Sequence, residues 1–214
     1  ASSETMKDVS PLSAVINDLE RQGRKIIFTM GKGGVGKTTV AAAIARELSR
    51  RGHRVQLTTT DPAAHVDDLV EKTEGLRVSR IDQEAALQQY RKTVLAEAEK
   101  NGLGKADLAY IEEDLRSPCT QEIAVFHAFA DIVDQGEDQI IVIDTAPTGH
   151  TLLLLESTEN YDKEIRRTRG ITPPSVQHLL PRLKSDDTEV VIVTLPEATP
   201  VYEALRLEED LKRT

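Results

Sequence analysis

The sequence predicts an α/β fold with three layers, in which helices cover both faces of a mostly parallel central sheet. Apolar runs of Ile and Val alternate along the chain with segments of helical character, as strands and crossover helices do in such folds. Aromatic residues make up only 3% of the chain and tryptophan is absent, so aliphatic side chains are expected to fill the core, which suits a parallel sheet. A length of 214 residues is that of one main domain.

Each predicted element has a local reason. The run KIIFTM at residues 25–30 reads as a buried strand, and the Ala-rich segment 38–51, with Gly52 just past its end, as the helix that follows. The Ile and Val run at residues 139–144 ends in Asp and suits the middle of a sheet. The predicted core strands are residues 25–30, 54–60, 139–144 and 189–195, and the predicted helices are residues 12–21, 38–51, 83–101, 105–115, 118–135, 152–155 and 199–212.

The domain organisation follows from breaks in the hydrophobic pattern. Residues 1–23 mix Ser, Pro and charged residues and are predicted as a lead-in, so residues 24–214 form the main domain. After a short apolar segment at residues 77–81, the helical tract within residues 83–135 is predicted as a subdomain inserted between core strands.

Two later segments are predicted to be mobile. Residues 158–170 and 173–185 are polar and interrupted by prolines. The sequence contains no internal repeat and no low-complexity tract.

Composition excludes several classes of protein. A formal net charge of -9 argues against nonspecific binding of nucleic acid, which requires a basic surface. The first residues lack the pattern of a signal peptide, and no apolar run approaches the length of a membrane span. A single cysteine, Cys119, excludes a disulfide within the chain and fits a reducing compartment. We therefore expect a cytoplasmic protein.

The strongest motif is a phosphate-binding loop. GKGGVGKT fits the pattern G-x-x-x-x-G-K-[ST] and lies between a predicted strand and a predicted helix, the context that the motif requires. Lys37 is expected to reach the β- and γ-phosphates, and the Thr38 hydroxyl to bind Mg²⁺. The residues predicted to bind nucleotide, ATP in this interpretation, are Gly31, Lys32, Gly33, Gly34, Val35, Gly36, Lys37, Thr38 and Thr39.

Two aspartates end predicted strands. Asp61 follows TTT and Asp144 follows VI, which places both at the edge where an open parallel sheet binds its ligand. Asp144 is predicted to hold the water shell of Mg²⁺. The residues predicted to surround the magnesium ion are Thr38, Asp61 and Asp144. A helix-capping role is an alternative for Asp61.

The phosphate loop carries a second lysine, Lys32, and K-G-G-V-G-K-T resembles the deviant P-loop of a group of ATPases. The group includes plasmid-partitioning, septum-positioning, nitrogenase-reductase, tail-anchored-protein-targeting and arsenite-pump ATPases. The resemblance implies that Lys32 crosses an interface to phosphates bound by a homologous second half. It also implies that Asp61 positions or activates the attacking water. The predicted catalytic residues are therefore Lys32, Lys37 and Asp61.

Two further stretches narrow the resemblance to the arsenite-transporting ATPase family. DTAPTGHTLLLL at residues 144–155 resembles a signature shared with the tail-anchored-protein-targeting ATPases. EEDLRSPCTQEIAVF at residues 112–126 resembles the metalloid-binding segment of the arsenite pump's catalytic subunit, in its carboxy-terminal half. The lead-in resembles the linker between halves, and VTLPE at residues 193–197 also matches.

The resemblance implies a metalloid site formed by Cys119, His150 and Ser117, with As(III) or Sb(III) as the activating ligand. A thiolate is the soft ligand that such centres prefer, and a helix start favours the thiolate. One cysteine cannot saturate a trivalent metalloid, so further thiols are expected from the second half. The structural alternatives are an inert Cys119, Ser117 as a helix N-cap before Pro118, and a His150 that only bonds backbone.

The implied function is ATP hydrolysis that drives arsenite or antimonite efflux. The implied partners are a homologous ATPase half, a membrane efflux protein and a metallochaperone that delivers As(III), with no nucleic acid; membrane association would be peripheral. The chain departs from the family by ending before the strand with an adenine-reading asparagine, so weak nucleotide binding and poor hydrolysis are expected of this piece alone. The alternatives are a tail-anchored-protein-targeting factor, disfavoured by two Met and the absence of C-x-x-C, and a positioning or DNA-partitioning ATPase, disfavoured by the absence of a basic tail.

Overall fold

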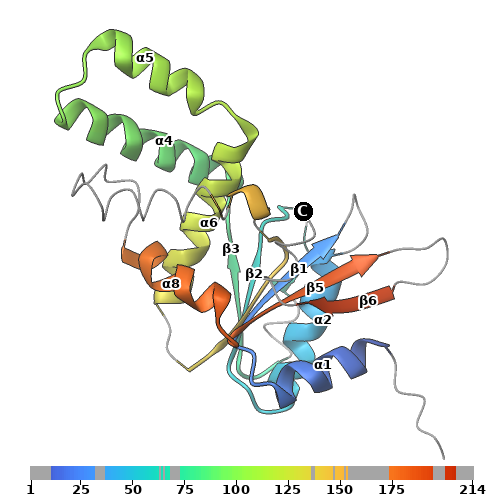
Figure 1. Cartoon of the computed structure of the whole chain (residues 1–214). Helices are drawn as coiled ribbons and strands as arrows, with labels where there is room; N and C mark the ends of the chain where they lie inside the picture. Colours follow the sequence, from blue (N-terminus) through green and yellow to red (C-terminus); the bar gives the residue numbers. More distant parts are fainter. Residues whose placement is uncertain are drawn as a thin grey trace, which may run out of the picture.

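The computed structural model confirms the α/β fold (Figure 1). It describes residues 11–31, 37–62, 64, 66–67, 73–135, 138–146, 148–151, 153, 174–194 and 201–205. The strands are β1 (Ile26–Gly31), β2 (Val55–Thr59), β3 (Leu76–Arg80), β4 (Ile140–Ile143), β5 (Thr188–Thr194) and β6 (Val201–Leu205). The helices are α1 (Pro11–Arg21), α2 (Lys37–Arg50), α4 (Gln83–Lys100), α5 (Lys105–Asp114), α6 (Pro118–Asp134) and α8 (Pro174–Lys184).

One sheet organises the molecule, with the strand order β3-β2-β4-β1-β5-β6. The first five of these strands are parallel, and β6 pairs antiparallel with β5. β1 lies between β4 and β5, and the register pairs Ile27 with Val142 on one side and with Glu189 on the other. The phosphate-loop segment therefore leaves the sheet from a central strand.

Alternation of side chains along β1 divides the core into two layers. Ile26 and Phe28 pack with residues of α6 and α8 on one face of the sheet. Ile27, between them, packs with residues of α1 and α2 on the other face. Helices thus cover both faces (Figure 1), which explains why the central strands are continuous apolar runs.

The helices at residues 83–135 differ in their relation to the sheet. α4 and α5 form a hairpin that extends away from the sheet, whereas α6 lies along its face (Figure 1). α5 has no buried residue, but α6 buries seven, including Phe126 and Phe129 in the core cluster with Phe28. Of these three helices, α6 therefore contributes most to the core that packs against the sheet.

Two predictions about secondary structure were wrong. Residues 201–205, predicted within a helix at 199–212, form strand β6, because β5 offers them a free edge for antiparallel pairing. The segment 173–185, predicted to be mobile, contains α8, whose Val176, Leu179 and Leu183 are buried at helical spacing.

Two further segments complete the comparison with the sequence. Residues 77–81 lie largely in an edge strand, β3. The predicted mobile segment 158–170 lies outside the described residues, as does most of the helix predicted at 152–155.

Candidate functional site

The candidate site lies where β1, β2 and β4 end, at their carboxyl edge. β1 ends at Gly31, and α2 begins at Lys37. Lys32, Gly33, Gly34, Val35 and Gly36 fall outside the described residues. Thr38 is half-buried and Thr39 exposed in the first turn of α2. The start of a helix thus faces the edge predicted to bind phosphate.

Asp144, immediately after β4, is fully buried and holds this edge together. Its Oδ2 accepts hydrogen bonds from Thr38 Oγ1 at 2.8 Å and from Thr59 Oγ1 at 2.6 Å. Its Oδ1 accepts from Thr60 N at 2.9 Å and from Thr60 Oγ1 at 3.1 Å. Four donors satisfy both oxygens, as burial of a carboxylate requires. The structure therefore brings Thr38 and Asp144 into direct contact.

Asp61 lies next to this network and is joined to it through its backbone. Its side chain is exposed, and its backbone N–H donates to Thr59 Oγ1 at 3.1 Å. Because Thr59 also donates to Asp144, one threonine connects the two aspartates predicted from the sequence. A displacement of the Asp61 backbone would therefore be transmitted to the buried carboxylate of Asp144 through the side chain of Thr59.

The donor set here suits magnesium. Mg²⁺ prefers hard oxygen ligands and is commonly held by one or two protein groups together with substrate phosphates and water. The hydroxyl of Thr38, in the first turn of α2, already lies 2.8 Å from the carboxylate of Asp144. These two residues fit a magnesium ion without a change of ligand type.

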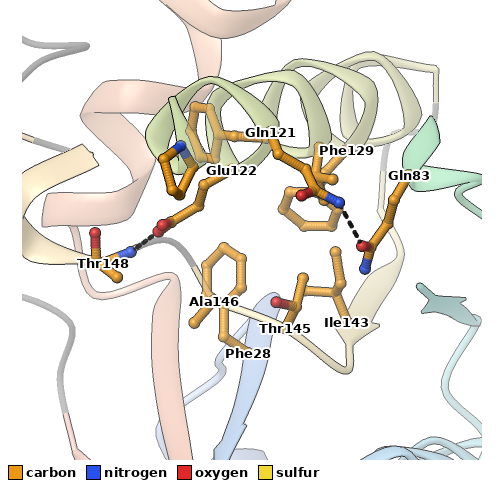
Figure 2. A pocket seen from close by; sticks show the side chains of 12 residues that line it. Phe28, Gln83, Gln121, Glu122, Phe129, Ile143, Thr145, Ala146 and Thr148 are labelled. Atoms are coloured by element: carbon orange, nitrogen blue, oxygen red, sulfur yellow. Dashed lines mark hydrogen bonds between the residues drawn. The ribbon is translucent and has the colours of Figure 1, made fainter. Parts of the chain in front are cut away.

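The loop after β4 leads from Asp144 toward α6. Thr148 N donates to Glu122 Oε1 of α6, and both residues line a pocket (Figure 2). The pocket has a volume of about 280 Å³, and Phe28, Phe129 and Ile143 are among the residues that line it. On its other side Gln121 Nε2 donates to Gln83 Oε1 at 2.9 Å, which ties α6 to α4 (Figure 2). The first turns of α6 therefore contact both the helical hairpin and the loop after β4.

The predicted metalloid residues lie around the same region. Cys119 is a free, half-buried thiol in the first turn of α6, while Ser117 and His150 are exposed. Ser117 occupies the N-cap position with Pro118 after it, but its side chain makes no cap bond; its Oγ lies 3.2 Å from Thr120 Oγ1. Within the described part of the chain, no three His, Cys, Asp or Glu side chains are placed to share a metal ion.

Sequence reasoning missed three residues of this region. Thr59 and Thr60 were read only as the end of a strand, yet both bind Asp144. A run of three threonines directly before an aspartate was the available signal. Glu122 carried no local signal, because its partner Thr148 is 26 residues away.

A five-stranded parallel sheet with a glycine-rich loop between β1 and α2, and an aspartate after β4 bonded to the first turn of that helix, defines a P-loop nucleoside triphosphatase fold. More narrowly, the chain belongs to the anion-transporting ATPase family, whose model matches residues 24–184. The resemblance stated from the motifs is thus confirmed at the level of the family.

Several curated relatives are similar to the chain. The arsenical pump-driving ATPase of Escherichia coli is 47% identical over 207 residues, which cover 96% of this chain and 35% of the relative. A putative arsenical pump-driving ATPase of Halobacterium salinarum is 34% identical over 98% of this chain and 36% of its own length. ATPase asna-1 of Caenorhabditis elegans is 34% identical over 67% of this chain. The chain spans about a third of the length of the first of these relatives.

Among the described residues, none forms a helix with the length and apolar character of a membrane span.

Proposed function

We propose that the chain is one nucleotide-binding half of an ATPase that hydrolyses Mg-ATP to drive efflux of arsenite or antimonite. The observation that carries the proposal is the hydrogen bond from Thr38 Oγ1 to Asp144 Oδ2 at the start of α2. That contact couples the phosphate-binding turn to the strand end that would sense the metal ion. The similarity to arsenical pump-driving ATPases supports the choice of cargo.

The chain's own residues would divide the work of hydrolysis. Backbone N–H groups of residues 31–38 and the ammonium groups of Lys32 and Lys37 would bind the phosphates and neutralise their charge. Asp61, exposed at the site, would orient the attacking water. Attack on the γ-phosphorus breaks its bond to the bridging oxygen and yields ADP and phosphate. Magnesium, when bound by Thr38 and Asp144, would stabilise the charge on the phosphate oxygens.

The cargo site would lie at α6 and at the helical turn after Thr148. Cys119 is the soft ligand, with Ser117 and His150 in support and thiols of a homologous second half completing the coordination. Binding across the two halves would favour their closed arrangement by the difference in affinity for the two states. We extend the proposal to a cytoplasmic location, peripheral attachment to a membrane efflux protein and delivery of As(III) by a metallochaperone.

The test is steady-state ATPase activity of the full protein, with and without antimonite, for wild type and Cys119→Ala. Stimulation is expected in wild type and is lost in C119A, while basal turnover is retained. Stimulation of the same size in both proteins would remove the metalloid role of Cys119. No hydrolysis by wild type, with or without antimonite, would remove the ATPase assignment.

A further inference from the structure

The loop between Asp144 and Thr148 is held at both ends. At its start, Asp144 is fixed by the four hydrogen bonds described above. At its end, Thr148 N donates to Glu122 Oε1, which reaches across from α6 (Figure 2). Between these two ends, Thr145 and Ala146 line the pocket of about 280 Å³, and Ala146 also packs against the core cluster that contains Phe28.

Thr148 is itself the cap of a helical turn. Residues 149–151 are helical, and Thr151 N donates to Thr148 Oγ1 at 3.2 Å, which is the bond of an N-cap to the third helical residue. In a capping box, a Glu at that third position would return a bond to the N–H of the cap. Here the third position is Thr151, whose hydroxyl instead lies 3.2 Å from Thr148 Oγ1.

Glu122 supplies the missing half of this capping box from another helix. We propose that Glu122 is a positioning residue that closes the cap at Thr148 in trans and thereby fixes the loop after β4 relative to α6. Its carboxylate also lies at the start of a helical turn, where the backbone dipoles favour a negative charge. The inference deepens the proposed function, because the loop joins Asp144 to His150.

The place of Glu122 on α6 gives the contact its consequence. Cys119 lies three residues earlier on the same helix, and residues at that spacing share a helix face. A displacement of the first turns of α6 would be passed through Glu122 to Thr148, and along four residues to Asp144. Gln121, the neighbouring residue, instead binds Gln83 of α4 and does not touch the loop through that bond.

Hydrogen exchange measures the contact without reference to activity. In the full protein, Glu122→Ala is expected to raise amide exchange at residues 148–151 about fivefold, the size of effect that loss of a helix cap produces. Glu122→Asp, which keeps the charge but shortens the reach, should do the same, while Glu122→Gln keeps an acceptor oxygen and most of the protection. Gln121→Ala is the matched control and should leave this exchange unchanged. Unchanged exchange at residues 148–151 in both E122A and E122D would overturn the proposal.

Kinetics then separate positioning from a merely structural role. E122A is expected to lower kcat about five- to tenfold while the KM for ATP changes less than about twofold, because the phosphate contacts come from a different loop. E122Q should recover most of kcat, and Q121A should match wild type. An unaltered kcat in E122A with faster exchange would overturn the positioning role. If wild type hydrolyses no ATP, the proposed function fails, and the exchange comparison alone supports or overturns the contact.

Discussion

Both ends of the central sheet bury a carboxylate, but the two are satisfied in different ways. At the carboxyl end, Asp144 is fully buried, and the donors that the described residues offer it are uncharged. At the amino end, Glu189 is 6% exposed and forms an ion pair of 3.0 Å with Arg24, which is 7% exposed. Neutral donors hold a carboxylate in place without cancelling its charge, whereas a guanidinium cancels it. The comparison favours the carboxyl end, at Asp144, as the end that would bind a cation.

The largest effect is expected at the amino end, in stability. Arg24→Met removes the ion pair with the buried carboxylate of Glu189, and also the hydrogen bonds from Arg24 to Gln22 and to the carbonyl of Asp186. The free energy of unfolding should fall by about 3–5 kcal/mol. Urea unfolding measures it, and ATPase activity per folded molecule should stay at the wild-type value. If R24M instead kept its stability but lost ATPase activity per folded molecule, the distinction between the amino and carboxyl ends of the sheet would be wrong.

The control for this variant is an exposed ion pair a few residues earlier in the sequence. Arg21 binds Asp18 at 2.6 Å, but the two side chains are 73% and 53% exposed. Arg21→Met should change the free energy of unfolding by less than about 0.5 kcal/mol. The double variant R24M/E189M should recover much of the stability, since apolar side chains replace both charges.

At the carboxyl end the expected effect is on turnover. Asp144→Asn keeps the shape but turns one acceptor oxygen into a donor that faces other donors. ATPase activity of the full protein should fall by about 100-fold, and the magnesium concentration for half-maximal activity should rise. Glu189→Gln is the matched change at the other end and should alter stability without this magnesium dependence. Equal magnesium dependence in wild type and D144N would contradict the role of Asp144.

Much of the fold was predictable, because its signals are local. The central strands are continuous apolar runs, since both faces of the sheet are covered. Helices α2, α4, α5 and α6 fall within one residue of the predicted bounds at each end, because glycines and prolines mark where they stop. β6 and α8 were missed since their states depend on distant partners: β6 on the free edge of β5, and α8 on burial against the core cluster.

The site divides along the same line. Asp144 was predicted at this edge because a parallel sheet binds its ligand beyond the carboxyl ends of its strands, and it does lie there, in contact with Thr38. The two threonines that bind it are the last residue of β2, Thr59, and the residue after it, Thr60, and strand order is not written in the sequence. Glu122 was missed for the same reason, since its contact depends on how α6 lies over the loop after β4.

A third buried ionisable group allows a smaller test, through pH. Burial lowers the pKa of His127 from its usual 6.5 to about 4, against an opposing influence of Asp131. His127 packs edge-on against Tyr90, with 5.1 Å between ring centroids, between α4 and α6, and its buried Nε2 has no hydrogen-bond partner among the residues that the structure describes. Since the unfolded chain binds a proton between pH 6.5 and 4 that the folded protein does not, its contribution to stability is present above pH 6.5 and is lost as pH falls through 4.

The expected loss is on the order of 2 kcal/mol, allowing for the partial exposure of the ring. It is measured as the difference between wild type and His127→Phe in urea unfolding at pH 7.5, 6.5, 5.5 and 4.5. His178→Gln is the control, because His178 is 68% exposed beside Asp134. Parallel pH profiles for wild type and H127F would show that the α4–α6 interface does not sense protonation.

The smallest and sharpest test compares two adjacent threonines of β2. Thr59 Oγ1 donates to Asp144 and accepts from Asp61 N, whereas Thr58 Oγ1 is buried and finds no hydrogen-bond partner among the described residues. Thr59→Val should therefore lower the free energy of unfolding by about 1–2 kcal/mol and slow turnover several-fold, because Asp144 Oδ2 loses one of its two donors and Asp61 N loses the Thr59 hydroxyl as its acceptor. Thr58→Val makes the same change of shape one residue earlier and should be neutral or stabilising, since it removes a buried hydroxyl that makes no hydrogen bond within the described part of the chain. Equal effects of T58V and T59V on turnover would mean that the shape of β2, and not the hydrogen bond to Asp144, is what the carboxyl end requires.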